Sequence, residues 1–167
     1  TYVVVAHLHY VIFGGRGFGF FSAIHYWFPK MTGRMYNQRT ATVAWLVLFV
    51  GFNILYFPMF IMGWQGMPRR YFSYPERFWA LNVASTAGAS VLAIGLVIVL
   101  VYLLVAIRWG AVAGANPWGS RGFEWDTPSP PPPENYETTP VYTHGPHEYQ
   151  EGADLPPAHA APEPKHV

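Results

Sequence analysis

Three apolar stretches, each long enough to cross a lipid bilayer, constrain this chain more than any other feature. A transmembrane helix needs about 20 predominantly apolar residues. Between Arg39 and Arg69 there is no formally charged side chain at all. Lipid cannot hydrogen-bond exposed backbone groups, so spans this apolar are expected to be helices. We predict three transmembrane helices, at about residues 2–28, 41–64 and 79–107.

The predicted fold class is an all-α membrane protein with an extended or disordered carboxyl-terminal tail. Residues 1–116 carry eight Lys or Arg and a single acid, whereas residues 117–167 carry two basic residues and eight acids. Twelve of those last 51 residues are proline. Such a segment buries too little apolar surface to fold by itself. We therefore predict two regions, a three-span region at 1–116 and a Pro-rich acidic tail at 117–167.

Charge also indicates how the spans are oriented. Lys30, Arg34 and Arg39 lie between the first two spans with no acid among them. By the positive-inside rule that connection lies on the cytoplasmic or matrix side of the membrane. The tail follows the third span, so we expect it on the same side. The connection between the second and third spans is then outside.

The chain contains no cysteine, which excludes disulfides, thiolate nucleophiles, iron–sulfur clusters and a Cys-ligated copper centre. Any metal must be held by histidine or oxygen. Thr1 leads directly into an apolar run, without the positively charged region of a signal peptide. We therefore expect an internal or carboxyl-terminal piece of a longer protein.

His7 and His9 are the leading candidates for a functional site. Ionisable residues inside a membrane span are expensive and are functional candidates by default. Positions i and i+2 on an α-helix are about 200° apart, so the two rings project almost oppositely and cannot chelate one small metal ion. Two large ligands such as hemes, one on each flank, would satisfy both rings because neutral imidazole binds heme iron axially. The alternative is that each histidine hydrogen-bonds to a neighbouring helix.

Arg69 and Arg70 are a second candidate, in the outer connection. Adjacent guanidinium groups beside a membrane need anions, and they pair well with carboxylates. Two hemes would present four propionates on the side where His7 and His9 lie. Binding of lipid headgroups is the alternative interpretation.

Two further features of the first span carry weaker expectations. Gly15 and Gly19 have the small-xxx-small spacing that lets another helix approach closely. Arg16 follows His9 by seven residues, about two turns of a regular α-helix, and so is expected near the same face. There it would face a heme edge or an acid outside this chain, or else reach a polar channel.

Four collinear motifs closely resemble the C-terminal quarter of subunit I of heme–copper cytochrome c oxidases. They are TYVVVAHLHYV at 1–11, YWFPKMTG at 26–33, GMPRRY at 66–71, and EW at 124–125 followed by PPPP at 130–133. The resemblance runs from Thr1 to about Tyr142. It implies that the three spans are the last three of a twelve-helix catalytic subunit.

The same resemblance implies roles for the candidate residues. His7 would be catalytic, as the proximal ligand of the high-spin heme iron where oxygen binds. His9 would be one axial ligand of the low-spin heme iron. Arg69 and Arg70 would bind heme propionates. Both hemes would be of the heme A type, while copper and magnesium would be held by residues preceding Thr1.

The implied activity is that of a respiratory terminal oxidase, reducing oxygen to water with electrons from cytochrome c and pumping protons. The implied partners are the rest of subunit I, other oxidase subunits including the one with the dinuclear copper, cytochrome c, and membrane lipid, with no nucleic acid. The location would be the bacterial plasma membrane or the mitochondrial inner membrane. The alternatives are a quinol oxidase, a relative of nitric oxide reductase, or a heme-free membrane anchor or assembly partner.

Overall fold

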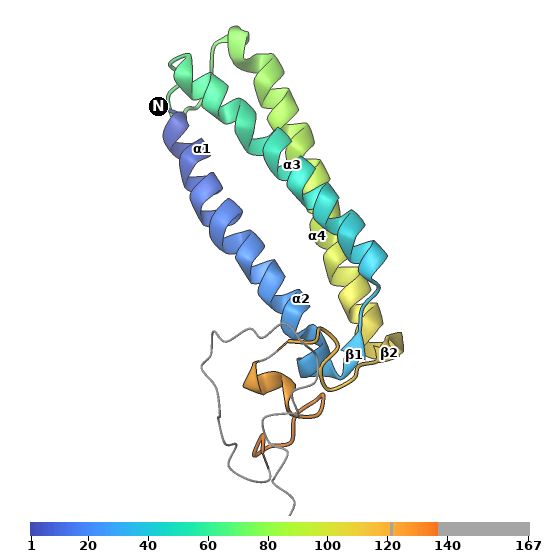
Figure 1. Ribbon diagram of the computed structural model, residues 1–167. Helices are drawn as coiled ribbons and strands as arrows, with labels where there is room; N and C mark the ends of the chain where they lie inside the picture. Colours follow the sequence, from blue (N-terminus) through green and yellow to red (C-terminus); the bar gives the residue numbers. More distant parts are fainter. Residues whose placement is uncertain (121, 137–167) are drawn as a thin grey trace, which may run out of the picture. The chain divides into compact units, whose positions relative to one another are not determined.

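The computed structural model describes residues 1–120 and 122–136. It forms two compact units (Figure 1). The first unit comprises residues 1–26 and 36–110, and the second comprises residues 27–35 and the described residues after 110. The described part of the chain is mostly helical, as predicted. Its helices are α1 (Val3–His9), the π-helix η1 (Tyr10–Gly17), α2 (Phe18–Thr32), α3 (Gln38–Trp64), the 3-10 helix η2 (Glu76–Phe78), α4 (Trp79–Trp109) and the 3-10 helix η3 (Phe123–Trp125).

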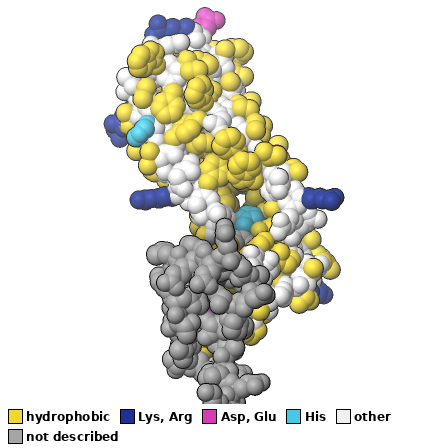
Figure 2. All heavy atoms as spheres, in the orientation of Figure 1, with side chains coloured by type: hydrophobic (Ala, Val, Ile, Leu, Met, Phe, Trp, Pro, Cys, Tyr) yellow, Lys and Arg dark blue, Asp and Glu magenta, His cyan; other side chains and the backbone are white. Residues whose placement is uncertain are grey.

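Helices α3 and α4 carry the two segments that are long and apolar enough to cross a membrane. Only 33% of the most apolar window of α3 and 28% of that of the α4 segment is buried, so most of each window is exposed in this chain. Figure 2 shows hydrophobic side chains over much of the visible face of the helices. Such a surface needs lipid or further apolar helices to cover it.

The first predicted span, 2–28, coincides with a helical run that changes type twice. Its segments α1, η1 and α2 have 7, 8 and 15 residues, and none of them alone has the length of a bilayer. The number of spans therefore stays a prediction, whereas the two long apolar helices are observed among the described residues.

Glycines let α3 and α4 approach closely. A Cβ atom at Gly51 would lie 2.5 Å from the backbone nitrogen of Leu92, and one at Gly88 would lie closer still to the backbone of Leu55. Real Cβ atoms essentially never come within 3.0 Å of a heavy atom from another part of the chain. The core on this contact comprises Ala44, Leu48, Phe52, Leu92, Val99 and Tyr102. Close backbone approach is a main source of helix association where lipid surrounds the helices.

The second unit contains the only strands in the described part of the chain. Strand β1 (Arg34–Met35) pairs antiparallel with β2 (Ala111–Val112). Beyond the strands, η3 buries Trp125, which is only 1% exposed. Residues 122–136 of the predicted tail thus contain a short 3-10 helix and a buried tryptophan, and are otherwise without helix or strand. The rest of the predicted tail, residues 137–167, lies outside the described residues.

Lys30 holds this second unit together. Its ammonium group is buried and donates to the backbone oxygens of Thr127 at 2.6 Å and of Ala115 at 2.9 Å. It also lies 5.2 Å from the ring centroid of Trp125. Burial lowers the pKa of Lys30, and the nearby carboxylates of Glu124 and Asp126 oppose that shift. A buried amine with several carbonyl acceptors explains how a proline-rich segment acquires a fixed position.

Replacing Lys30 with methionine is expected to loosen the second unit. The substitution keeps an apolar stem but leaves the backbone oxygen of Ala115 and the buried backbone oxygen of Thr127 without this donor, at a cost of about 1–3 kcal/mol. Amide hydrogen exchange in residues 111–136 should accelerate by about 5- to 150-fold. Arg39→Met removes an exposed positive charge and should leave that exchange unchanged. Equal exchange in both variants would show that Lys30 does not hold the segment.

Candidate functional site

His7 and His9 both lie in α1, the regular α-helix that precedes the π-helix η1. Helix α1 spans Val3–His9, so the 200° separation expected for these two positions applies. His7 is exposed, whereas His9 is half-buried against α3. The two rings therefore lie on different flanks of α1.

The ring of His9 has a defined tautomer. Its Nδ1 lies 2.7 Å from the backbone oxygen of Val5, and because a carbonyl oxygen only accepts, Nδ1 carries the proton. Nε2 is then the nitrogen with a free lone pair, which is the form that binds a metal ion. Within the described residues Nε2 has no hydrogen-bond partner. The ring also stacks on Tyr56 of α3, with centroids 4.4 Å apart and planes inclined by 16°.

His7 has a different environment. No hydrogen bond or ring contact joins its imidazole to another residue among those the structure describes. The alternative interpretation, in which each histidine hydrogen-bonds to a neighbouring helix, is therefore not met by this part of the chain. Both imidazoles keep a nitrogen available for a ligand.

The π-helix η1 starts directly after His9. Segments of π-helix occur frequently at functional sites. The backbone N–H of Tyr10 donates to the oxygens of Ala6 and His7, four and three residues before it, so the α-helical pattern continues up to the start of η1. Wider turns place more residues in each turn, so seven residues no longer complete two turns. Arg16 lies within η1 and is exposed, so its spacing from His9 no longer implies a shared face.

The connection that carries Arg69 and Arg70 lies beside the start of α1. The backbone N–H of Tyr2 donates to the oxygen of Met67 at 2.8 Å, and Met67 is fully buried. The rings of Tyr2 and Tyr71 meet edge to face at 5.7 Å. The structure thus brings the arginine pair to the end of the bundle at which α1, the helix of both histidines, begins.

Both guanidinium groups are exposed and lack an ion pair or hydrogen bond to any residue in 1–120 or 122–136. Arg70 also has a φ of 57°, in the left-handed region that residues with a Cβ rarely adopt. Such a conformation costs on the order of 1–3 kcal/mol and tends to occur at ligand sites. Two uncompensated cations on a constrained turn are suited to bind carboxylates or phosphates.

These residues fit heme better than a metal ion held by protein alone. The described residues contain no group of three or more His, Asp or Glu side chains that could hold a metal. A heme iron needs only one or two protein ligands, because the porphyrin supplies the others. One imidazole on each flank of α1, with cations near its start, is consistent with two hemes and their propionates.

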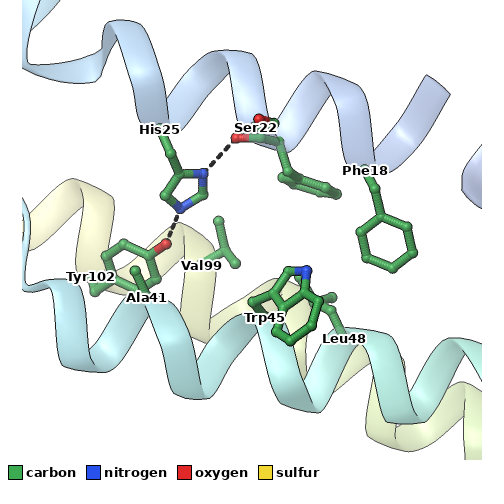
Figure 3. Close-up of a pocket in the computed structure, with 9 residues that line it drawn as sticks. Phe18, Ser22, His25, Ala41, Trp45, Leu48, Val99 and Tyr102 are labelled. Carbon is green, nitrogen blue, oxygen red and sulfur yellow. Dashed lines mark hydrogen bonds between the residues drawn. The ribbon is translucent and has the colours of Figure 1, made fainter. Parts of the chain in front are cut away.

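Two contacts of the first unit could not be found from sequence spacing. One is the stacking of Tyr56 on His9, two residues that are 47 positions apart. The other is a hydrogen-bonded chain in which His25 contacts the backbone oxygen of Phe21 and the hydroxyl of Tyr102 (Figure 3). The second contact borders an apolar cavity of about 220 Å³ lined in part by Phe18, Trp45 and Leu48.

Comparisons with known proteins find matches that cover most of the chain. Residues 1–91 match the family model described as Cytochrome C and Quinol oxidase polypeptide I. Cytochrome c oxidase subunit 1 of Thermostichus vulcanus is 44% identical, with 89% of this chain and 27% of the relative covered. Cytochrome c oxidase subunit 1 of Bacillus sp. (strain PS3) is 41% identical, covering 84% and 23%. The heme-copper oxidase subunit I+III of Aeropyrum pernix is 39% identical, covering 84% and 17%. The chain thus spans about a quarter or less of the length of these relatives.

Proposed function

Because this chain belongs to the cytochrome c and quinol oxidase polypeptide I family, we propose that it forms part of the catalytic subunit of a respiratory terminal oxidase. The activity we propose is reduction of oxygen to water with electrons from cytochrome c, coupled to proton pumping. The observation that carries the proposal is the pair of imidazoles on different flanks of α1, each with a free ligand position.

In this proposal His9 is one axial ligand of a low-spin heme. The bond from Nδ1 to Val5 makes Nε2 the ligand nitrogen of the neutral ring and directs it away from the helix backbone. His7 is the proximal ligand of a second, high-spin heme and is the residue of this chain nearest to the chemistry. Bound heme iron would supply the electron-transfer and oxygen chemistry, which the protein tunes through ligation and burial.

Arg69 and Arg70 would bind the heme propionates. Their position beside the start of α1 supports this role, because it puts cations at the end of the bundle where the histidines lie. The constrained φ of Arg70 supports it further, since strain in a turn persists where a ligand uses the resulting geometry.

The family and the two long apolar helices make this a membrane protein. We propose three spans within residues 1–116, with residues 117–167 on the cytoplasmic or matrix side of a bacterial plasma membrane or mitochondrial inner membrane. The partners would be the rest of subunit I, the other oxidase subunits including the one with dinuclear copper, cytochrome c, and membrane lipid. Copper and magnesium would be bound by residues outside this chain, and the hemes would be of the heme A type.

A pyridine hemochrome assay tests the proposal on the purified complex that contains this chain. We expect two hemes for each copy of the chain, because each histidine would bind one iron. The α-band of the hemochrome also identifies the heme type. A complex without heme would leave only the alternative of a heme-free anchor or assembly partner.

A quinol oxidase is the second candidate, because the family description names quinol oxidases beside those of cytochrome c. Oxygen consumption with reduced cytochrome c and with a quinol as alternative donors would separate the two. Consumption of nitric oxide with the same donors, without consumption of oxygen, would instead indicate a nitric oxide reductase.

A further inference from the structure

The contact between His9 and Tyr56 has the geometry of a restraint on ring orientation. An imidazole held only by its bond from Nδ1 to Val5 still rotates within the tolerance of one hydrogen bond. The near-parallel ring of Tyr56, with its centroid 4.4 Å away, blocks one face of the imidazole. The hydrogen bond and the stack together fix the plane of the ring as well as its tautomer.

The ring of Tyr56 is itself held in place by its neighbours on α3. It lies on one face of α3 with Phe52 and Phe60, which are four residues to either side of it, and its ring contacts that of Phe52 at 5.1 Å. Tyr10, the neighbour of His9, packs on Phe52 and Phe60 at 4.8 and 5.3 Å. This aromatic face is anchored because Phe52 is buried in the contact between α3 and α4.

The ring of Tyr56, and not its hydroxyl, makes the contact. Among the described residues no hydrogen bond joins the Tyr56 hydroxyl to another group, so its chemistry toward His9 is that of a flat aromatic surface. His7 has no comparable neighbour in the described part of the chain. The chain therefore restrains one of its two candidate ligands and leaves the other to be positioned from elsewhere.

We propose that Tyr56 is a positioning residue that sets the plane of the His9 imidazole as an axial ligand of the low-spin heme. The inference rests on the proposed function, because it assumes that His9 binds heme iron. The plane of an axial imidazole determines which iron d orbitals it overlaps. Rotation of that plane therefore shifts the g values of the ferric low-spin heme, a property that a merely structural residue would not control.

The test is electron paramagnetic resonance of the oxidised complex carrying substitutions at Tyr56. Tyr56→Phe keeps the flat ring and should reproduce the native low-spin g values. Tyr56→Leu, and Tyr56→Met as a variant with a longer, unbranched side chain, remove the ring and should shift and broaden the low-spin signal. Phe49→Leu is the matched control, since Phe49 lies on the same helix and stacks on Trp45, with planes inclined by 15°, away from either candidate ligand. It should leave the signal unchanged.

The proposal is overturned if Tyr56→Leu or Tyr56→Met retains the native g values, or if Tyr56→Phe shifts them as much as those variants do. A separate measurement distinguishes failure of the underlying function. If His9→Ala retains the low-spin signal, His9 is not the ligand. If His9→Ala loses that signal while the apolar Tyr56 variants do not change it, His9 is the ligand and only the role of Tyr56 is rejected.

Discussion

His9→Ala is expected to abolish the low-spin heme signal of the assembled oxidase, and His7→Ala is expected to abolish the high-spin signal instead. Each substitution removes the imidazole whose lone pair one iron needs, and leaves the other imidazole in place. The two effects should be separable because the rings lie on different flanks of α1. Optical spectra of the oxidised and reduced complex measure both signals.

Turnover should fall on the order of 100-fold or more in each variant, since even removal of groups that merely support a metal ligand costs 10- to 100-fold. His25→Ala is the matched control, because it removes a third histidine of the same helical run. The contacts of His25 are to Phe21, Tyr36 and Tyr102 within the first unit, so its loss should preserve both heme signals. If His7→Ala and His9→Ala gave the same spectrum, the assignment of one heme to each would be rejected.

Gly88→Ala is expected to destabilise the packing of α3 against α4. The added Cβ would collide with the backbone of Leu55 and Ile54, which cannot move aside as a flexible side chain can. Overpacking of this kind costs about 1–3 kcal/mol, more than the gain of up to about 1 kcal/mol from replacing a helical glycine with alanine. Thermal unfolding of the purified protein in detergent, followed by circular dichroism, measures the loss.

Gly19→Ala supplies the comparison for this substitution. No described atom lies within 4 Å of a Cβ at that position. Helix propensity should then dominate, and the change should be neutral or stabilising by up to about 1 kcal/mol. Destabilisation at Gly19 equal to that at Gly88 would mean that close approach of α3 and α4 is not the cause.

The sequence was sufficient to identify the family and to locate the long helices. The resemblance based on four motifs is confirmed by the family match and by relatives covering most of the chain. Predicted spans at 41–64 and 79–107 agree closely with α3 (Gln38–Trp64) and α4 (Trp79–Trp109). Long uncharged windows predict membrane helices well because a bilayer accepts few other structures.

Sequence reasoning was weaker where structure depends on contacts between distant residues. It singled out the spacing of Gly15 and Gly19, whereas close approaches to backbone in the described residues occur at other glycines, among them Gly51, Gly63 and Gly88. It predicted an extended or disordered tail from composition alone, and could not anticipate the bonds from the buried Lys30 to the backbone oxygens of Ala115 and Thr127. Glycine and proline content indicate which conformations a segment can adopt. The residues that contact the segment determine which of those conformations forms.

The candidate site divides in the same way. The opposite projection of His7 and His9 follows from helical geometry, and α1 has that geometry. The choice of Nδ1 as the protonated nitrogen of His9, and the stacking on Tyr56, depend on atoms that periodicity does not describe. The roles of these residues in heme binding remain proposals for the experiments above.

The π-helix between α1 and α2 has a consequence for how this helical run meets its surroundings. Residues in η1 advance around the axis by a smaller angle than those in an α-helix, so the angular phase of α2 differs from the continuation of α1. The directions in which His7 and His9 point are therefore independent of the direction in which His25 points, although all three residues belong to one continuous helical run. One helical run can in this way direct its first histidines toward one set of neighbours and His25 toward another, without a compromise between the two orientations.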